Sequence, residues 1–347
     1  MSNPTYRGGI IGLGFIGGAD QVSGDALGQQ VSGLDGTHLQ AMQNHARVEL
    51  VAGSSRDSGR RERFTQKTAA RTYADWRELL ERESLEIVSV ATYAPQHADI
   101  VVACAEQGVR AIFCEKPLAT TLADGERMLA ACRQSGALLA VNHNRRFHPD
   151  YRRLRDLIAE GGLGELTSAN VQWATGRLGN VGTHMFNALA MLVGRRVTAV
   201  YATLDPAGRP DCRGAAFHDP GGCGVLEFEG GLKATFDAAD FARTPAAIAI
   251  NGRTGRARIG GKGVEMEYWD GQTDFWPTAA GNESSMDRAM AEIVAWLDGG
   301  GSFADPPENS LHTLEVILAC HASHRRHGAG TNLPLFGNDC LLEVHSG

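Results

Sequence analysis

The chain has 347 residues, enough for two domains, and 43% of them are hydrophobic, so a sizeable core can be buried. The formal net charge of −7 argues against a nucleic-acid partner, which would require clustered Lys and Arg. The sequence contains no long apolar run that could span a membrane, and residues 1–7 lack the pattern of a signal peptide. We therefore expect a cytoplasmic protein with no membrane segment.

The first 142 residues alternate short apolar runs with helical patterns, which is typical of βαβ units and a parallel sheet. The sequence predicts strands at residues 9–11, 48–53, 87–91, 109–114 and 137–141. Helices are predicted between them at residues 38–44, 58–67, 98–107 and 122–135.

The pattern changes after a predicted helix at residues 149–160, because closely spaced strands follow with few helices between them. This spacing favours an antiparallel sheet. The predicted strands are 167–175, 197–204, 224–229, 232–238, 246–251, 257–259 and 264–269, and helices at 285–297 and 310–327 close the chain. We predict a first domain at residues 1–142 and a second at 143–347.

A glycine-rich turn, Gly12-Leu-Gly14-Phe-Ile-Gly17, directly follows the first predicted strand. In a βα unit the first Gly makes the tight turn, the second lets a pyrophosphate approach the backbone, and the third lets the helix pack on the strand. The helix N-terminus then offers amide groups to the phosphates. We interpret Gly12, Gly14, Phe15, Ile16 and Gly17 as dinucleotide-binding residues; the alternative is an ordinary glycine-rich turn.

Residues 18–36 form a Gly-, Asp-, Gln- and Ser-containing stretch that interrupts the first helix expected after this turn. We interpret the stretch as an insertion, either a lid over the cofactor or a surface loop.

The end of the second predicted strand indicates which nicotinamide cofactor is preferred. NAD enzymes generally carry an acidic residue there, whereas a nearby Arg accommodates the 2′-phosphate of NADP. Ser55 and Arg56 stand at this place, and Asp57 follows one or two positions late. The pair favours NADP over NAD, with a solvated residue at a helix start as the alternative for Arg56.

Several motifs, in order, resemble the Gfo/Idh/MocA oxidoreductase family over nearly the whole chain. They are Cys114-Glu115-Lys116-Pro117, Thr92-Tyr93-Ala94-Pro95-Gln96-His97, the segment 142–149 and Gly182-Thr183-His184. The resemblance implies an N-terminal Rossmann doubly wound parallel sheet, then an α/β domain with a large open antiparallel sheet. It also implies a homodimer or homotetramer formed through that sheet. The cofactor contacts it implies are Pro95, His97, Glu115, Lys116 and Asn144.

Two side chains are candidates for the chemistry of hydride transfer, which needs a proton acceptor for the substrate hydroxyl. Lys116 follows a predicted strand at the end where α/β sheets bind ligands, and its ammonium can stabilise developing negative charge. His184 has a pKa range suited to proton transfer near neutral pH. The alternatives are a surface Lys and a core His; with the family resemblance we predict Lys116 and His184 as catalytic residues.

The sequence departs from the family pattern at Asn180 and Asn187, where family dehydrogenases typically have aspartates. Asn180 precedes His184 by four residues, so both lie on one face of a helix, but an amide cannot accept a proton. Either Lys116 and His184 carry the acid–base work or the chemistry differs from that of a simple dehydrogenase. Three acidic residues of the insertion could also supply a carboxylate: Asp20, Asp25 and Asp35. The predicted substrate-binding residues are Asn180, Arg146, Tyr93 and Asn187.

His321, His324 and His327 follow one another at three-residue spacing. Such spacing places them on one helical face, but cationic groups are ordinarily favoured at a helix C-terminus. We therefore predict no metal site.

The sequence predicts hydride transfer between NAD(P) and a hydroxyl or carbonyl carbon of a sugar, sugar derivative or cyclitol. One alternative is a glycosidase that retains NAD and oxidises its sugar transiently. Another is a ligand-sensing binding protein, because a Rossmann domain alone does not imply catalysis.

Overall fold

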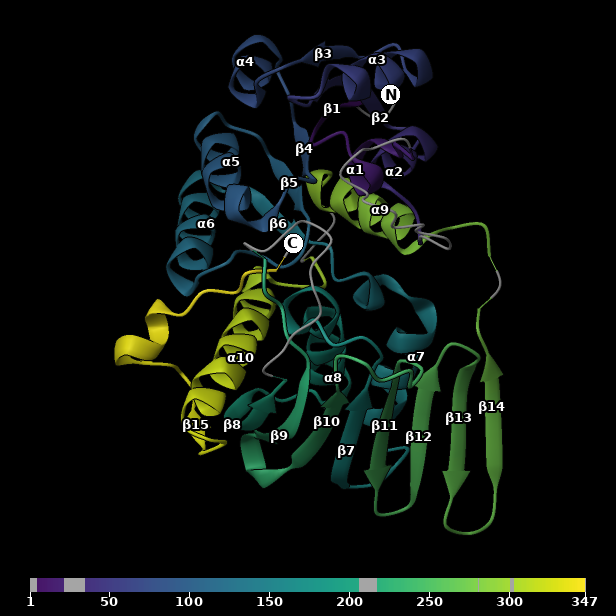
Figure 1. Cartoon of the computed structure of the whole chain (residues 1–347). Coiled ribbons are helices and arrows are strands. Elements are labelled where there is room, and N and C mark those ends of the chain that lie inside the picture. Colours follow the sequence, from purple (N-terminus) through teal and green to yellow (C-terminus); the bar gives the residue numbers. More distant parts are fainter. Residues whose placement is uncertain (1–4, 22–34, 206–216, 280, 300–302, 347) are drawn as a thin grey trace. The chain divides into compact units, whose positions relative to one another are not determined.

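The computed structural model describes residues 5–21, 35–205, 217–279, 281–299 and 303–346 (Figure 1). The chain divides into two compact units. The first comprises Met1–Ala119, Ala123–Asn144 and Asn282–Glu308, and the second comprises Thr120–Leu122, Arg145–Gly281 and Asn309–Gly347. Residues 282–308, which the sequence analysis assigned to the second domain, group with the first unit instead. No helix among the described residues is long and apolar enough to cross a membrane.

The first unit is built on a six-stranded parallel sheet in the order β3-β2-β1-β4-β5-β6. This is the strand order of the predicted Rossmann fold. The strands are β1 (Tyr6–Ile11), β2 (Val48–Ser54), β3 (Arg71–Tyr73), β4 (Ile87–Val90), β5 (Ala111–Cys114) and β6 (Leu138–Val141). The helices are α1 (Phe15–Gly18), α2 (His38–Asn44), α3 (Ser58–Lys67), α4 (Trp76–Arg82), α5 (Ala94–Glu106), α6 (Leu122–Ser135) and α9 (Ser285–Leu297).

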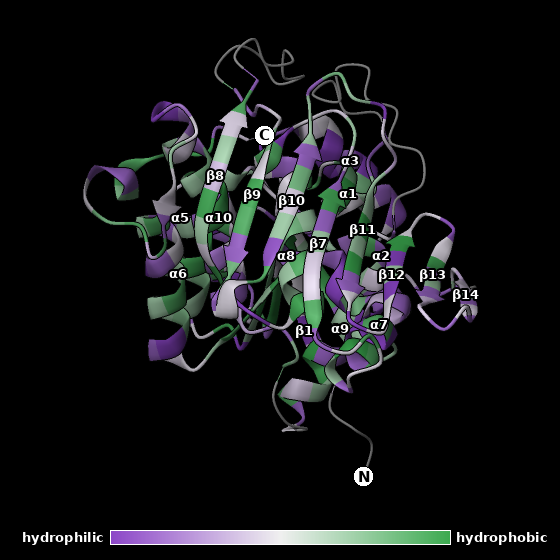
Figure 2. Ribbon diagram, turned by 90° about the horizontal axis from the view of Figure 1, so that it is seen from below, coloured by the Kyte–Doolittle hydropathy of each residue, from purple (hydrophilic) through white to green (hydrophobic). Residues whose placement is uncertain are grey.

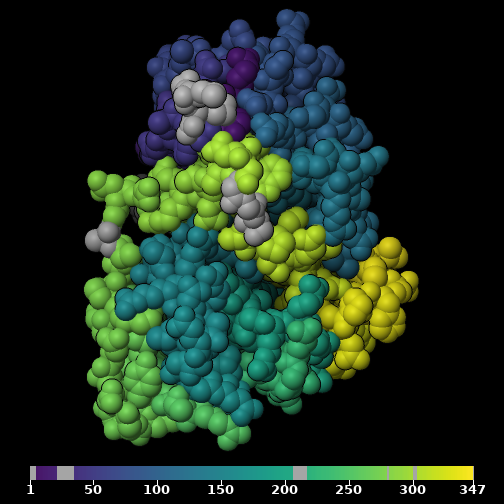
Figure 3. Space-filling model, turned by 180° about the vertical axis from the view of Figure 1, so that it is seen from behind, coloured from purple at the N-terminus to yellow at the C-terminus, as the bar shows by residue number. Residues whose placement is uncertain are grey.

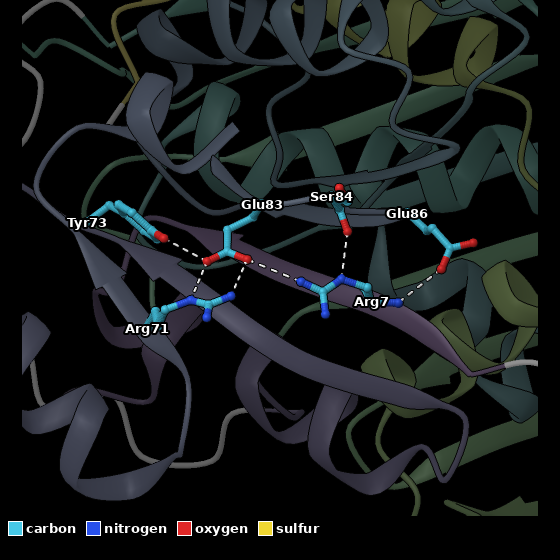
Figure 4. Close-up of polar contacts among 6 residues, drawn as sticks. All are labelled: Arg7, Arg71, Tyr73, Glu83, Ser84 and Glu86. Carbon is cyan, nitrogen blue, oxygen red and sulfur yellow. Dashed lines mark hydrogen bonds and ion pairs between the residues drawn. The ribbon is translucent and has the colours of Figure 1, made fainter. Parts of the chain in front are cut away.

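The carboxylate of Glu83 fastens the short edge strand β3, which the sequence analysis missed together with α4 (Figure 4). Its oxygens accept hydrogen bonds from Arg71 at 2.6 and 2.7 Å and from the Tyr73 hydroxyl at 2.6 Å, and Arg7 of β1 lies 3.2 Å away. These contacts, that of Arg71 above all, lower the pKa of Glu83 despite its burial. One buried carboxylate thus links β3 to β1 without help from an apolar pattern.

Helix α9 packs on α2, which explains why it belongs to the first unit. In the space-filling view its yellow-green surface lies against the blue surface of the first unit (Figure 3). A capping box between Ser284 and Asp287 starts the helix, and Asn44 of α2 donates to Asp287 at 3.0 Å. At its other end Asp298 accepts from the Tyr6 hydroxyl at 2.7 Å and forms an ion pair with Arg47. These contacts join α9 to α2, to the start of β1 and to the segment before β2.

The second unit contains a nine-stranded sheet in the order β14-β13-β12-β11-β7-β10-β9-β8-β15, with helices α8 and α10 on one face (Figure 2). The strands are β7 (Leu166–Gln172), β8 (Val197–Leu204), β9 (Gly222–Phe228), β10 (Lys233–Ala238), β11 (Ala247–Gly252), β12 (Gly255–Gly260), β13 (Gly263–Tyr268), β14 (Thr273–Pro277) and β15 (Thr331–Asn332). The helical segments are η2 (Asn144–Phe147), α7 (Pro149–Ala159), η3 (Leu178–Gly182), α8 (Thr183–Val193), η4 (Glu229–Gly231), α10 (Pro307–Arg325) and η5 (Gly337–Leu341).

The predicted large antiparallel sheet is confirmed, with one exception: β10 runs parallel to β7. The other pairs in this sheet are antiparallel. Between β7 and β10 the chain passes through α8 and the β8–β9 hairpin, and a crossover of this length allows a strand to return in the same direction. Alternate residues of β10 are buried and exposed, so one face of the sheet carries the core.

Candidate active site

The glycine-rich turn after β1 leaves space for a pyrophosphate at one glycine only. A Cβ on Gly12, where φ is +101°, would lie 2.4 Å from the carbonyl oxygen of Ala91, and one on Gly17 would lie 1.9 Å from the carbonyl oxygen of Gly12. A Cβ on Gly14 would meet nothing closer than the guanidinium of Arg60, 3.8 Å away. Gly12 and Gly17 thus permit the tight turn and the close packing, and Gly14 leaves the backbone open.

The helix after this turn is short. Phe15 and Ile16, both half-buried, open α1, which ends at Ala19 in the left-handed conformation. The inserted Asp20 is buried and bonds bidentately to Arg63 of α3, with both N–O distances 2.8 Å. The insertion is therefore fastened to α3 at its first described residues, whereas residues 22–34 lie outside the described part.

No carboxylate at the end of β2 is placed to bind a ribose hydroxyl. Asp57 accepts the backbone N–H of Arg60 at 2.8 Å as the N-cap of α3. Arg61 donates to the carbonyl oxygens of Ser55 and Arg56 at 2.6 and 2.9 Å, which shapes the loop between strand and helix. Ser55 is half-buried and Arg56 is exposed. The loop therefore presents a hydroxyl and guanidinium groups.

Lys116 follows β5 and is held through its neighbour, Glu115. The buried Glu115 carboxylate accepts from His38 Nε2 at 3.0 Å, from Asn142 at 2.7 Å and from the backbone N–H of Lys116 at 3.3 Å. The Ser89 hydroxyl lies 2.9 Å from Nδ1 of His38, so an imidazole with its proton on Nε2 satisfies both contacts. Four elements of the first unit thus hold one carboxylate.

The charge of Glu115 is stabilised in this position. Burial by itself raises the pKa of the carboxyl group, but the hydrogen bond and charge of His38, the Lys116 ammonium and the Asn142 amide together lower it to about 2. The group is therefore ionised at neutral pH, and Lys116 next to it meets a fixed negative charge.

His97 holds the loop on the other side of Lys116. It is fully buried in α5, with Nδ1 at 3.0 Å from the carbonyl oxygen of Pro117 and Nε2 at 3.1 Å from that of Thr92. Burial lowers its pKa although three carbonyl groups favour its charged form. These contacts hold Lys116 and the loop before α5 in place, and the cofactor contacts expected for His97 and Glu115 stay a prediction.

The remaining predicted residues of the first unit are accessible at the same strand ends. Tyr93 is the N-cap residue of α5 and is half-buried, as are Lys116 and Asn144, while Pro95 in the first turn is exposed. Tyr93 and Pro95 follow β4, Lys116 follows β5 and Asn144 follows β6, and the carboxyl ends of parallel strands form one edge of the sheet.

In the second unit, Asn180 and His184 lie where the π-helical turn η3 passes directly into α8. Both side chains are half-buried. The buried carboxylate of Asp219 accepts the backbone N–H groups of Gly179 and Asn180 at 2.7 and 2.9 Å. Its pKa is raised by burial, although these hydrogen bonds act in the opposite direction. π-Turns recur at functional sites, and here Asp219 fixes the turn that precedes His184.

Asn187 is fully buried one turn further along α8, and it connects Arg146 to α10. Its Oδ1 accepts from Nε of Arg146, and its Nδ2 donates to the Thr313 hydroxyl at 3.1 Å. The Asn187 amide therefore bridges a guanidinium and a hydroxyl, and its expected role in binding substrate stays a prediction. Arg146 is itself largely buried.

The two described acidic residues of the insertion have partners within the first unit. Asp20 is paired with Arg63, and Asp35 accepts the backbone N–H of Ser285 at 3.0 Å, both within the first unit. Asp25 lies outside the described residues. A role for an insertion carboxylate in place of the missing aspartates stays a prediction.

Sequence reasoning missed four functional neighbours: His38, Ser89, Asn142 and Asp219. Asn142 carried a signal, since it follows a predicted strand in the same way as Lys116. No local pattern pointed to His38 or Asp219. His38 lies 77 residues from its partner Glu115, and Asp219 lies about 40 residues from its partners Gly179 and Asn180.

Comparison with known protein families covers most of both units. Residues 6–143 match the family model of the GFO/IDH/MocA oxidoreductases, described as having an NAD-binding Rossmann fold. Residues 151–258 match the GFO/IDH/MocA C-terminal domain.

Similar proteins include several dehydrogenases. A trans-1,2-dihydrobenzene-1,2-diol dehydrogenase of Mus musculus is 27% identical over 231 residues, which cover 61% of this chain and 66% of that enzyme. A D-apiose dehydrogenase of Paraburkholderia graminis is 33% identical over 160 residues, 46% of this chain and 38% of that enzyme. Each match spans less than two thirds of the relative. The WlbA dehydrogenase from Bordetella pertussis, solved with NADH and UDP-GlcNAcA, has the same fold, with a TM-score of 0.76 at 20% identity over 97% of this chain and all of its own.

Proposed function

The chain belongs to the Gfo/Idh/MocA oxidoreductase family, and from that premise we propose that it transfers a hydride between NAD(P) and a carbon of a sugar, sugar derivative or cyclitol. The observation that carries the proposal is Lys116, held by the buried, ionised Glu115 at the edge of an NAD-binding Rossmann sheet. Dehydrogenases of a dihydrodiol and of apiose among the similar proteins support a substrate with hydroxyl-bearing carbons.

In the oxidation, the substrate loses a hydride from carbon and a proton from its hydroxyl group. The cofactor, when bound, supplies the acceptor for the hydride. The Lys116 ammonium holds the substrate oxygen and stabilises the negative charge that develops on it. His184 accepts the proton, and Asn180 and Arg146 bind neighbouring hydroxyl groups. Tyr93 and Asn144 bind at the strand ends beside Lys116. Because Asn180 and Asn187 cannot take a proton, this division of roles assigns the acid–base work to Lys116 and His184.

NADP is the preferred cofactor in this proposal, because the loop after β2 offers Ser55 and Arg56 while Asp57 serves as a helix cap. Fluorescence titration should give a lower Kd for NADPH than for NADH. In the Arg56→Ala variant the Kd for NADPH should rise about tenfold, the loss expected for one charge-assisted hydrogen bond, while the Kd for NADH stays constant. Equal Kd values for the two cofactors in the unmodified chain would remove the NADP assignment.

Turnover is tested by a panel of sugars, sugar acids and cyclitols with NAD and NADP, followed by the absorbance of the reduced nicotinamide. Steady accumulation of reduced cofactor with at least one panel member is expected, and cofactor binding without any turnover would contradict the dehydrogenase. The dehydrogenases reported above give no support to the glycosidase alternative, so it is not carried further.

We also propose that the chain forms a homodimer or homotetramer through the sheet face that the helices do not cover. On β8, Tyr201 is 42% exposed, as expected for an aromatic side chain that a second copy covers. Light scattering after gel filtration should give a mass of two or four chains, and Tyr201→Asp should reduce it. A monomer at micromolar concentration would contradict this arrangement.

A further inference from the structure

A groove in the second unit gathers three histidines outside the residues proposed for the reaction. It is a half-open hollow of about 430 Å³, within the range of volumes of small-molecule sites. The end of α10, the segment η5 and the C-terminal tail form it, together with His218, whose backbone pairs with that of His345. We call it the histidine groove; its lining residues are His218, His321, Arg325, Asn338, Leu341, Leu342, Glu343 and His345.

Half of the eight side chains that line the histidine groove, three imidazoles and one guanidinium, carry positive charge when protonated. His218, Arg325, His324 and His345 all act on His321 with like charge, and burial followed by these charges lowers the pKa of His321 to about 4. Glu343 is the one acidic lining residue, 3.8 Å from Nε2 of His345. The groove therefore holds more imidazole and guanidinium groups than can be charged together without a counterion.

His321 provides a second observation. Its Nε2 is buried, and among the described residues it has no hydrogen-bond partner. Buried polar atoms in folded proteins are nearly always satisfied, so an atom of this kind in the wall of a groove marks a place where a ligand group completes the bonding. In contrast, His324 on the same helix turn accepts the backbone N–H of Leu204 at 3.1 Å.

We propose that the histidine groove binds a small organic anion through its carboxylate or phosphate group. Such a group is an acceptor only and matches the guanidinium of Arg325, the amide of Asn338 and protonated imidazoles. A metal ion is the less suitable occupant, because no three His, Cys, Asp or Glu residues of the described chain are grouped as metal ligands.

A ligand in the groove would contact residues adjacent in sequence to those that hold the π-turn η3. His218 lines the groove and the next residue, Asp219, holds the N–H groups of Gly179 and Asn180. Likewise Glu343 and His345 line it, whereas Val344 lies beside Gly179, where an added Cβ would stand 2.4 Å from its Cγ1. Binding in the groove should therefore alter the environment of the turn before His184.

Isothermal titration of the full chain without cofactor tests the proposal with four probes: glucose 6-phosphate, inorganic phosphate, citrate and neutral glucose. We expect saturable 1:1 binding of glucose 6-phosphate or citrate, weakened at least tenfold in His321→Gln and in Arg325→Gln. His327→Asn is the matched control, because His327 is an exposed residue outside the groove with positive φ, which Asn tolerates. Binding of only the phosphate or only the carboxylate probes identifies which group is recognised.

The pH dependence and the signal of His321 give independent readings. Without an anion the pKa of His321 is about 4, and a bound anion favours its protonated form, so the affinity should increase as the pH falls toward 4. The anion should raise the pKa of His321 in an imidazole NMR titration. Absence of binding by every anion, equal binding of glucose, or unchanged affinity in both folded variants would overturn the proposal. The test needs no cofactor, so a negative result leaves the oxidoreductase proposal standing.

Discussion

The segments around Lys116 and His184 are held in place by different means. In the first unit the buried carboxylate of Glu115 accepts hydrogen bonds from side chains of α2 and of the segment after β6. In the second unit Asp219 collects backbone N–H groups of a π-turn, and tail residues pack behind that turn. A parallel sheet brings its strand ends to one edge, so residues at these ends need few additional contacts to lie close together. An irregular turn has no such edge and depends on distant segments.

The largest effect is expected at Lys116. Lys116→Met removes the ammonium while keeping most of the side-chain volume, so kcat/KM should fall about a thousandfold, with the Kd of the cofactor changed by less than threefold. Steady-state kinetics and cofactor titration measure the two quantities. Lys262→Met, at an exposed turn, is the matched control and should retain full activity. Unimpaired turnover in Lys116→Met would remove this residue from the chemistry.

His184→Gln tests the second segment in the same way. The amide keeps polar contacts but cannot accept a proton at neutral pH, so kcat should fall about a hundredfold. The fall in kcat/KM toward acidic pH, which reports protonation of the free base, should also disappear from the pH profile. His327→Asn serves as the control, and a profile that keeps its acidic limb in His184→Gln would assign the proton transfer to another group.

Glu115→Gln should lower the stability of the fold more than Asp219→Asn does, because it leaves a buried hydrogen-bond network with mismatched partners. The free energy of unfolding should fall by about 1–3 kcal/mol. The folded pKa of Glu115 is depressed to about 2, so its stabilising effect is complete above pH 4.5 and is lost as pH falls toward 2. Denaturant unfolding at several pH values should therefore show native chain and variant converging below pH 4.5. A constant difference down to pH 2 would contradict the assigned charge.

Asp219→Asn should give the smallest change in stability and activity. It tests whether a carboxylate that holds backbone N–H groups matters less than one that holds side chains. Asn retains one acceptor oxygen, so one of the two N–H groups of the π-turn loses its partner, at a cost of about 1 kcal/mol. Because the turn precedes His184, kcat should decrease severalfold while the Kd of the cofactor stays constant. Thermal unfolding and steady-state kinetics measure both. If kcat were unaffected while stability fell, Asp219 would support the fold and not the position of His184.

Much of the first unit was predictable from the sequence, because its signals are local. Short apolar runs marked five of its strands, and the helices 38–44, 58–67 and 122–135 have the predicted bounds. Strand β3 was missed because it has three residues, only partly buried, and is held by the Glu83 carboxylate instead of by an apolar pattern. The pairing of Asp20, in the insertion, with Arg63 was not predictable, because the two residues are 43 positions apart in the sequence.

The second unit shows where local signals end. Individual strands such as 197–204 were predictable, but the parallel pairing of β7 with β10 depends on the path of the chain between them. The spacing of Asn180 and His184 indicated one helical face, whereas the π-turn between them arises from Asp219, 39 residues beyond Asn180. Pairings of this kind follow from tertiary packing and leave no periodic trace in the sequence.

The central proposal is that Lys116 and His184 serve one reaction. A double-mutant cycle on kcat/KM with Lys116→Met, His184→Gln and the combined variant tests it most directly. Groups that act on the same transition state are strongly non-additive, so the combined variant should be little slower than Lys116→Met alone. If the two losses multiplied fully, the residues would act independently, and a shared role in proton transfer and oxyanion stabilisation would be contradicted.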